Sequence, residues 1–271
     1  LRPQCFYDLV IQVSIVRPGP IQGGMVHPYL KRRRREEAIT YAHPDLEPIL
    51  ARTLGVPIFQ EQVMAMAVAV GGFTPGEADE LRRGMSAWRK HGTLGPLIQK
   101  LIDGMRANGI SDAYAEQISD QIRGFGEYGF PESHAASFAR LVYVSAWLKC
   151  HYPAAFCAAL LNSQPMGFYS PRSLIDDARR HGVTALPVDV QHSNYDNTLE
   201  RDEDNNLSIR IGLRQIRGLK RQTGERIELA RQHGSFTSIA DLQKRADLKR
   251  GEIARLARAD ALRSLSNHRR Q

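Results

Sequence analysis

The segment IRIGLRQIRGLKRQTGERIELARQHGSF, residues 209–236, places a glycine turn between two short stretches with helical spacing. Leu213 precedes the turn at Gly218, and Ile227 and Ala230 follow it on one helical face. This pattern predicts a short helix, a tight turn and a second helix that packs back on the first. A glycine at such a turn lets the first backbone N–H groups of the second helix approach an anion closely.

Cationic side chains surround this turn. Arg217, Lys220, Arg221 and Arg226 flank Gly218, and such side chains contact phosphate oxygens without reading base sequence. The segment resembles a helix-hairpin-helix motif, which implies that these five residues bind the DNA backbone. Lys220 stands where that motif commonly has a second glycine. An ordinary pair of antiparallel helices without a ligand is the alternative.

The charge of the chain is distributed unevenly over its 271 residues, which carry a net charge of +8. Residues 206–271 hold 16 Lys and Arg against 6 Asp and Glu, whereas residues 1–205 hold 21 against 23. A segregated basic region is typical of a surface that binds a polyanion, and a solvated basic surface is the alternative. No apolar run approaches the roughly 20 residues that span a bilayer, so we expect no membrane partner.

Three cysteines, Cys5, Cys150 and Cys157, occur without a Cys-x-x-Cys pair. This odd number argues against a disulfide framework or a zinc ribbon. We expect Cys150 and Cys157 to be buried thiols on a helix, with metal binding together with His151 as the alternative. A reducing, cytoplasmic environment fits this usage. The chain starts at Leu1 without a methionine, which suggests a piece of a longer protein.

Helical patterns dominate residues 45–182, and the fold class we expect is mainly α. A capping box at Thr74 opens a helix that we expect to end near Met85. Residues 135–149 are apolar nearly all round and predict a buried central helix. Further helices are expected over 93–108, from 111 to the glycine loop at 124, from 153 to 162, and from 170 to 182. Alternation at Leu207, Ile209 and Ile211 predicts a short β-hairpin instead.

The loop GFGEYGFPESHAASFARL, residues 124–141, combines glycines and aromatic residues in front of that central helix. We expect Ser133 to cap the helix and His134 to add a donor beside its N-terminus. Tyr128 would form part of an aromatic wall. The pattern predicts a pocket for a base and its phosphates, although it is not a P-loop.

Two further segments carry cations in special contexts. In SIVRPGPIQGGMVHP, residues 14–28, Arg17 precedes a rigid Pro-Gly-Pro corner, which predicts an anion clamp or a plain turn. In LRRGMSAWRK, residues 81–90, Arg82, Arg83 and Lys90 accompany a tryptophan. These side chains predict phosphate binding or a solvated cationic helix end.

Several segments, in this order, resemble the α subunit of bacterial C-family DNA polymerases. They are VRPGPIQGGMVHPYL, GVPIFQEQVM, ADELRRGMSAWRK, FGEYGFPESHAASFA, YVSAWLKCHYPAAFCAALLNSQPMGFY and IGLRQIRGL. The forms at 131–134, 86–88 and 162–169 resemble the error-prone, damage-tolerance branch. The resemblance implies a multi-helix fingers domain over 1–186, a linker and the start of the β-hairpin over 187–205, and a small helix-hairpin-helix bundle over 206–271.

The resemblance also implies roles for individual residues. Phosphate or template contacts would be Arg17, Arg82, Arg83 and Lys90, and the wall of the nucleotide pocket would be Tyr128, Ser133 and His134. The partners would be primer-template DNA, dNTP, damage-response accessory proteins and the sliding clamp, in the bacterial cytoplasm at the nucleoid.

The family implies nucleotidyl transfer in translesion synthesis, with Mg²⁺ held by aspartates of the palm domain. We expect no catalytic or metal-binding residue in this chain. Asp202 and Asp204 match the spacing of a metal-binding pair but lie in an apparent surface turn. A stand-alone DNA-binding protein or a degenerate polymerase remnant is the alternative. A small-molecule enzyme using Ser133 and His134 is the weakest reading.

Overall fold

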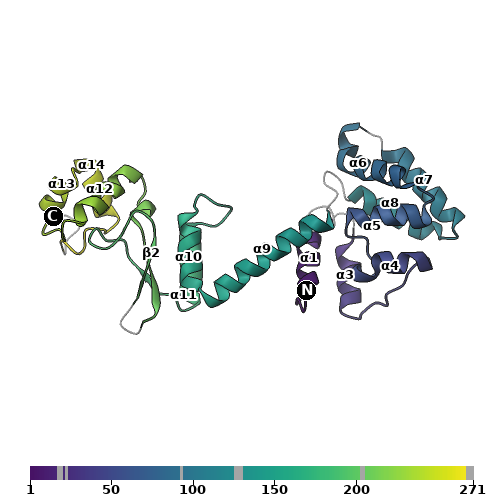
Figure 1. The fold of residues 1–271 in the computed structure, drawn as a ribbon, viewed down its shortest axis with the longest axis horizontal. Helices are drawn as coiled ribbons and strands as arrows, with labels where there is room; N and C mark the ends of the chain where they lie inside the picture. Colours follow the sequence, from purple (N-terminus) through teal and green to yellow (C-terminus); the bar gives the residue numbers. More distant parts are fainter. Residues whose placement is uncertain (17–20, 22–23, 92–93, 125–130, 202–204, 267–271) are drawn as a thin grey trace. The chain divides into compact units, whose positions relative to one another are not determined.

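The computed structural model describes residues 1–16, 21, 24–91, 94–124, 131–201 and 205–266, without the side chains of residues 86–91 and 124. Within these residues the chain forms two compact units, Leu1–Val144 and Ser145–Gln271. Helices dominate both units, which confirms the predicted mainly α fold (Figure 1).

The described part of the first unit is helical. Its elements are α1 (Phe6–Ile15), α3 (Val26–Arg33), η1 (Pro44–Leu46), α4 (Glu47–Leu50), η2 (Ala51–Thr53), α5 (Gln60–Val70), α6 (Pro75–His91), α7 (Leu94–Ala107), α8 (Asp112–Gly124) and the first part of α9 (Glu132–His151).

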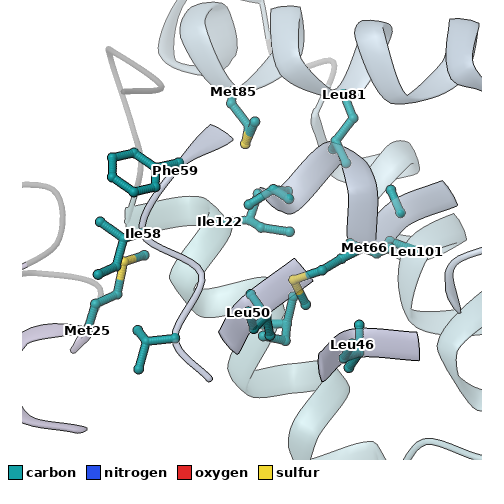
Figure 2. Packing of buried hydrophobic residues seen from close by; sticks show 14 of the residues in the cluster. Met25, Leu46, Leu50, Ile58, Phe59, Met66, Leu81, Met85, Leu101 and Ile122 are labelled. Carbon is teal, nitrogen blue, oxygen red and sulfur yellow. The ribbon is translucent and has the colours of Figure 1, made fainter. Parts of the chain in front are cut away.

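The core of the first unit is one cluster of apolar side chains from helices that lie far apart in the sequence (Figure 2). Leu46, Leu50, Met66, Leu81 and Met85 have no exposed surface. Each such side chain stabilises the fold by about 1.5–3 kcal/mol relative to an exposed one. The repeated apolar positions of α4, α5 and α6 therefore define this unit.

Helix α6 begins with the capping box predicted at Thr74. The Thr74 N–H donates to Glu77 Oε2 at 2.9 Å, and the Glu77 N–H donates to Thr74 Oγ1 at 3.3 Å. The helix continues to His91 rather than ending near Met85. The reason is that residues 86–91 contain neither glycine nor proline, the residue types that most strongly oppose a helix.

The end of α5 approaches α7 through a backbone contact. A Cβ atom on Gly104 would lie 2.0 Å from the carbonyl oxygen of Gly71, so a side chain at position 104 cannot be accommodated without moving a helix. Glycine at this position sets the distance between the two helices.

The apolar segment 135–149 lies in α9 as predicted, but the prediction that this helix is buried is wrong. Ala135 and Ala139 are fully buried, whereas Leu141 is 62% exposed and Trp147 is 44% exposed. A helix that is apolar all round is buried only where other elements cover it. Among the described residues, only the first turns of α9 contribute side chains to a core cluster.

The second unit combines helices with a small sheet. Its elements after α9 are α10 (Pro153–Asn162), α11 (Pro171–Arg180), β1 (Ala185–Leu186), β2 (Thr198–Arg201), β3 (Leu207–Arg210), η3 (Leu213–Gln215), α12 (Arg221–Arg231), α13 (Ile239–Arg245) and α14 (Arg250–Arg258).

Strands β2 and β3 form the predicted antiparallel hairpin, with Thr198 opposite Arg210 and Arg201 opposite Leu207. Strand β1 pairs with β3 in the parallel direction, giving the order β1-β3-β2, and it was not predicted. Ile209 of β3 is fully buried against side chains of α10 and α11. A separate apolar cluster holds η3, α12, α13 and α14 together.

The three cysteines differ in exposure. Cys157 lies buried in α10, and burial raises the pKa of its thiol to about 11. Cys5 and Cys150 are exposed, so the prediction of a buried thiol is wrong for Cys150, which lies in the uncovered part of α9. No helix in the described part of the chain is long and apolar enough to cross a membrane.

Candidate nucleic-acid interface

The predicted hairpin forms between η3 and α12. The chain leaves η3 at Ile216, turns at Gly218 with a φ of 78°, and enters α12 at Arg221. Lys220 is the N-cap residue, with a φ of −78° and a ψ of 150°. A lysine side chain cannot accept a hydrogen bond from the first N–H groups of the helix. These donors stay available to an anion at the positive end of the helix.

A second hairpin follows between α13 and α14, within the region 206–271 that the resemblance assigns to a small helix-hairpin-helix bundle. The chain turns at Asp247 with a φ of 48°, and Lys249 is the N-cap residue of α14 with a φ of −76° and a ψ of 153°. These angles match those of Lys220. The triplet Leu-Lys-Arg ends both turns, at 219–221 and 248–250. The structure thus contains two hairpins of the same backbone form.

Both hairpins open onto one hollow of about 830 Å³. Its lining includes the N-cap residues Lys220 and Lys249, and both residues are exposed. Within the described part of the chain, neither lysine forms an ion pair with a carboxylate. The full lining is Gly218, Lys220, Gln222, Thr223, Glu225, Arg226, Leu229, Lys249, Gly251, Glu252 and Arg255.

Glu252 of α14 connects the two hairpins. Its carboxylate accepts hydrogen bonds from the Thr223 hydroxyl, from Arg226 Nη2 at 3.0 Å and from the Lys249 N–H at 2.8 Å. Burial acts to raise the pKa of Glu252, but these bonds and the Arg226 charge outweigh burial, so the pKa lies below its ordinary value. The carboxylate is therefore ionised and holds α12 and α14 in register.

Of the five predicted DNA-backbone residues, Gly218, Lys220 and Arg226 line the hollow. Arg226 is also engaged inside the protein, since its Nη1 donates to the Asp247 carbonyl oxygen at 2.7 Å. Arg217 and Arg221 are exposed outside the lining. Arg221 Nε donates to the Glu225 carboxylate at 2.8 Å. Phosphate contacts by these residues stay predictions.

Several arginines of the basic C-terminal region serve the fold. Arg231 donates to the carbonyl oxygens of Val190 and Ser193 at 3.0 and 2.7 Å, and burial lowers the pKa of its guanidinium group. Other arginines pair with carboxylates, namely Arg210 with Glu200, Arg214 with Asp196 and Arg245 with Asp241. The net charge of this region therefore overstates the number of cations available to a ligand.

Arg82 and Arg83, predicted to bind phosphate, share one carboxylate on α6. Arg82 Nε donates to Asp79 Oδ1 at 2.8 Å, and Arg83 Nη2 lies 2.6 Å from Asp79 Oδ2. The hydrogen bond from Arg82 is the main cause of the lowered pKa of Asp79. Asp79 keeps the two guanidinium groups close together, and Arg83 is the more exposed of the two.

The prediction that Ser133 caps the central helix is wrong. Helix α9 begins at Glu132, whose N–H lies 3.1 Å from one carboxylate oxygen of Glu61 and 3.2 Å from the other. This carboxylate from α5 occupies the positive end of α9. Ser133 lies inside the first turn, and the ring of His134 lies 4.6 Å from that of Phe138.

Several predicted residues lie outside the description. Arg17, Tyr128, Asp202 and Asp204 are not among the described residues, and Lys90 lies in α6 without a described side chain. Among the described residues, no group of three or more His, Cys, Asp or Glu side chains could hold a metal ion.

Two family models match the chain. Residues 1–109 match the bacterial DNA polymerase III alpha subunit finger domain, and residues 182–271 match the helix-hairpin-helix motif, a range that contains both hairpins. The chain is thus similar to bacterial DNA polymerase III α subunits over its first 109 residues.

Curated proteins to which the chain is similar carry the name error-prone DNA polymerase. The chain is 60% identical to that of Alkalilimnicola ehrlichii over 270 residues, 57% identical to that of Methylococcus capsulatus over 287 residues, and 58% identical to that of Pseudomonas fluorescens strain Pf0-1 over 269 residues. These alignments cover 99–100% of the chain but only 26–27% of each relative. The chain thus spans about a quarter of the length of these relatives.

Sequence reasoning missed the candidate residues of the second hairpin. Lys249 and Arg255 line the hollow, and Arg250 begins α14. The repeated Leu-Lys-Arg triplet was the available signal. It was overlooked because Asp247, rather than glycine, occupies the turn position with positive φ.

Proposed function

We propose that this chain forms the fingers and the DNA-binding hairpins of an error-prone DNA-directed DNA polymerase that acts in damage-induced translesion synthesis. The relatives that carry this name support the proposal. We assign residues 1–186 to the fingers domain, 187–205 to the linker and the start of the β-hairpin, and 206–271 to the helix-hairpin-helix region. The fingers close over the incoming dNTP while the hairpins hold the primer-template DNA.

The observation that carries the DNA-binding part is the convergence of the two hairpins. Lys220 and Lys249 stand at the N-termini of α12 and α14 with the same backbone conformation, and both line one hollow. Each helix start offers free N–H donors, a positive dipole end and one ammonium group to a phosphate oxygen. Contacts of this kind position a duplex without selecting its sequence.

For the fingers, we propose that Arg17, Arg82, Arg83 and Lys90 contact the triphosphate or the template strand. Tyr128, Ser133 and His134 form the wall beside the base. Arg82 and Arg83 are supported by their placement, because Asp79 holds both guanidinium groups together on α6. Two neighbouring cations suit a polyanionic substrate such as a triphosphate.

Nucleotidyl transfer by such an enzyme uses Mg²⁺ bound by clustered carboxylates. The described residues offer no such cluster, so we place the metal in the palm domain of the complete enzyme. This chain contributes binding and orientation of the substrates. Accessory proteins of the damage response, the sliding clamp and a location at the nucleoid complete the proposal.

A salt series on duplex DNA tests the hairpin assignment. Replacing both N-cap lysines, Lys220→Ala with Lys249→Ala, should lower the slope of log affinity against log salt by about 1.8, since each phosphate contact on duplex DNA contributes about 0.9. The control with the same charge change is Arg172→Gln with Arg179→Gln on exposed positions of α11. Equal slopes for the two double variants would refute the assignment.

A second experiment separates a polymerase from a stand-alone DNA-binding protein. In the complete enzyme, Arg82→Ala with Arg83→Ala should raise KM for dNTP and leave duplex affinity unchanged. A loss of duplex affinity as large as the loss in dNTP use would argue against a triphosphate role.

A further inference from the structure

A basic run at the end of α3 encloses a second hollow, in the first unit. The run is Lys-Arg-Arg-Arg-Arg-Glu, residues 31–36, and the hollow has a volume of about 850 Å³. Its lining contains five arginines and one acidic residue, namely Arg2, Arg32, Arg33, Arg34, Arg35 and Glu36. None of the described residues named above for nucleotide or DNA binding belongs to its lining.

Two arginines of the run, Arg32 and Arg33, form hydrogen bonds and ion pairs inside the protein. Arg33 forms a two-pronged ion pair with Asp8, at 2.6 and 2.8 Å, and also donates to the carbonyl oxygens of Leu1 and Arg2. These bonds fix the first residues of the chain beside the end of α3. Because Arg33 holds Arg2 in this way, the Arg2 side chain belongs to the same hollow.

Arg32 secures the other side. Its Nε donates to Glu37 Oε1 at 2.9 Å, and its Nη1 donates to the Leu54 carbonyl oxygen at 2.9 Å. The bonds of Arg32 and Arg33 hold the end of α3 in place next to Arg34 and Arg35.

The other two arginines of the run, Arg34 and Arg35, are exposed, and few of the described carboxylates lie near enough to neutralise their charge. Arg34 is 64% exposed and lies 4.0 Å from Glu36. Arg35 is exposed and has no carboxylate partner among the described residues. Elsewhere in the first unit, exposed arginines are commonly paired with a carboxylate at 3.2 Å or less, namely Arg52, Arg83, Arg106 and Arg123.

Arg35 also occupies a backbone position that suits glycine better. Its φ is 61°. The Arg35 N–H donates to the Arg32 carbonyl oxygen and the Glu36 N–H donates to that of Lys31, at 3.0 and 2.9 Å. These two hydrogen bonds form a Schellman motif, in which glycine usually occupies the position that Arg35 has here. An arginine held there against its backbone preference points to a use for its charge.

We propose that Arg2, Arg34 and Arg35 bind phosphate groups of a nucleic-acid backbone, as a site separate from the hairpins. The identity of the ligand as nucleic acid rests on the function proposed above. No aromatic side chain is among the described residues that line the hollow. The proposed contacts are to phosphate, so we expect binding that does not depend on base sequence.

The test uses the whole chain with Arg34→Gln and Arg35→Gly combined, against the α11 double variant Arg172→Gln with Arg179→Gln as the control of equal charge. Affinity is measured over a salt series for a labelled single-stranded oligonucleotide and for the matching duplex. We expect about tenfold weaker binding at 50 mM salt than in the control. The salt slope should fall by about 1.4 if the ligand is single-stranded and by about 1.8 if it is duplex. Affinity equal to that of the control on both DNAs would overturn the proposal.

Two single variants separate charge from folding. Arg35→Gly should keep or raise the thermal midpoint, because glycine fits the positive φ, and should still weaken binding. Arg35→Lys keeps the charge and should keep most of the affinity. A loss with Arg35→Lys as large as that with Arg35→Gly would overturn the phosphate assignment.

Combining Arg34→Gln and Arg35→Gly with Lys220→Ala and Lys249→Ala distinguishes this site from the hairpins. A further loss of affinity in that background supports the site even if the hairpin assignment fails. Vesicles of anionic lipid provide the other arm. Vesicle binding that the Arg34, Arg35 double variant abolishes, with DNA binding unchanged, would assign the hollow to a membrane surface instead and overturn the proposal.

Discussion

The two hairpins of the second unit reach the same backbone form by different residues. The first turns at Gly218 and follows a single turn of 3-10 helix, whereas the second turns at Asp247 and follows α13. Their N-cap lysines nevertheless share one conformation. Aspartate tolerates positive φ better than most residues. A turn glycine therefore marks the first hairpin in the sequence, whereas the second hairpin has no such glycine.

The contact that joins the hairpins gives the largest expected effect. Glu252→Ala removes the acceptor for Thr223, Arg226 and the Lys249 N–H. We expect a loss of about 2–3 kcal/mol in the free energy of unfolding of the second unit, below the full cost of breaking a buried pair because Arg226 is partly solvated. Chemical denaturation followed by circular dichroism measures this loss.

The matched control is Glu225→Ala, which removes an exposed carboxylate of the same hollow that pairs with Arg221. An exposed pair of this kind contributes at most about 1 kcal/mol. If both variants lose the same stability, Glu252 does not couple the hairpins.

Substitutions at the turns should differ between the hairpins. Gly218→Ala forces a Cβ into positive φ and brings it to 3.3 Å from Arg255 Nε, so we expect a loss of about 1–2 kcal/mol. Asp247→Gly relieves a milder strain and should change stability by no more than about 0.5 kcal/mol. Thermal unfolding of both variants measures the difference. A loss for Asp247→Gly as large as that for Gly218→Ala would mean that positive φ is not what the two turns have in common.

The two N-cap lysines should contribute equally to DNA binding if both hairpins bind phosphate. Lys220→Ala and Lys249→Ala should each weaken duplex binding several-fold at low salt and lower the salt slope by about 0.9. Lys244→Ala on α13, exposed and outside the hollow, serves as the control. A loss confined to Lys220→Ala would leave the second hairpin as a purely structural copy.

The smallest expected effect is a pH dependence carried by Glu252. The pKa of this carboxyl is lower in the folded protein than its ordinary value of 4.5. Its contribution to stability is therefore complete above about pH 4.5 and is lost as the pH falls through the folded pKa. Glu252→Gln should flatten the fall of the thermal midpoint below pH 4.5, and an unchanged profile in this variant would contradict the role of Glu252.

Much of the fold could be predicted because local signals agree with the final structure. The capping box at Thr74, the helix start at Pro153 and the alternation at Leu207 and Ile209 each act within a few residues. Strand β1 was missed because it is two residues long and pairs with a distant strand. The exposure of α9 was missed because composition does not reveal which neighbour covers a helix.

The candidate site was predictable only in part for a related reason. The charge count identified the C-terminal region, but it could not separate Lys220, which is unpaired among the described residues, from Arg231, which binds backbone carbonyls. Nor could the sequence show that Glu61 lies against the start of α9, because that contact joins residues 71 positions apart. Long-range contacts determine which charges remain free.

The exposed apolar side chains of α9 have a practical consequence for handling the isolated chain. Phe138, Leu141, Tyr143 and Trp147 are each 44–62% exposed. Large apolar side chains exposed in this number promote self-association and adsorption to hydrophobic surfaces. Preparations of the chain alone should therefore precipitate at concentrations that its net charge would otherwise tolerate, and mild detergent should keep them monodisperse.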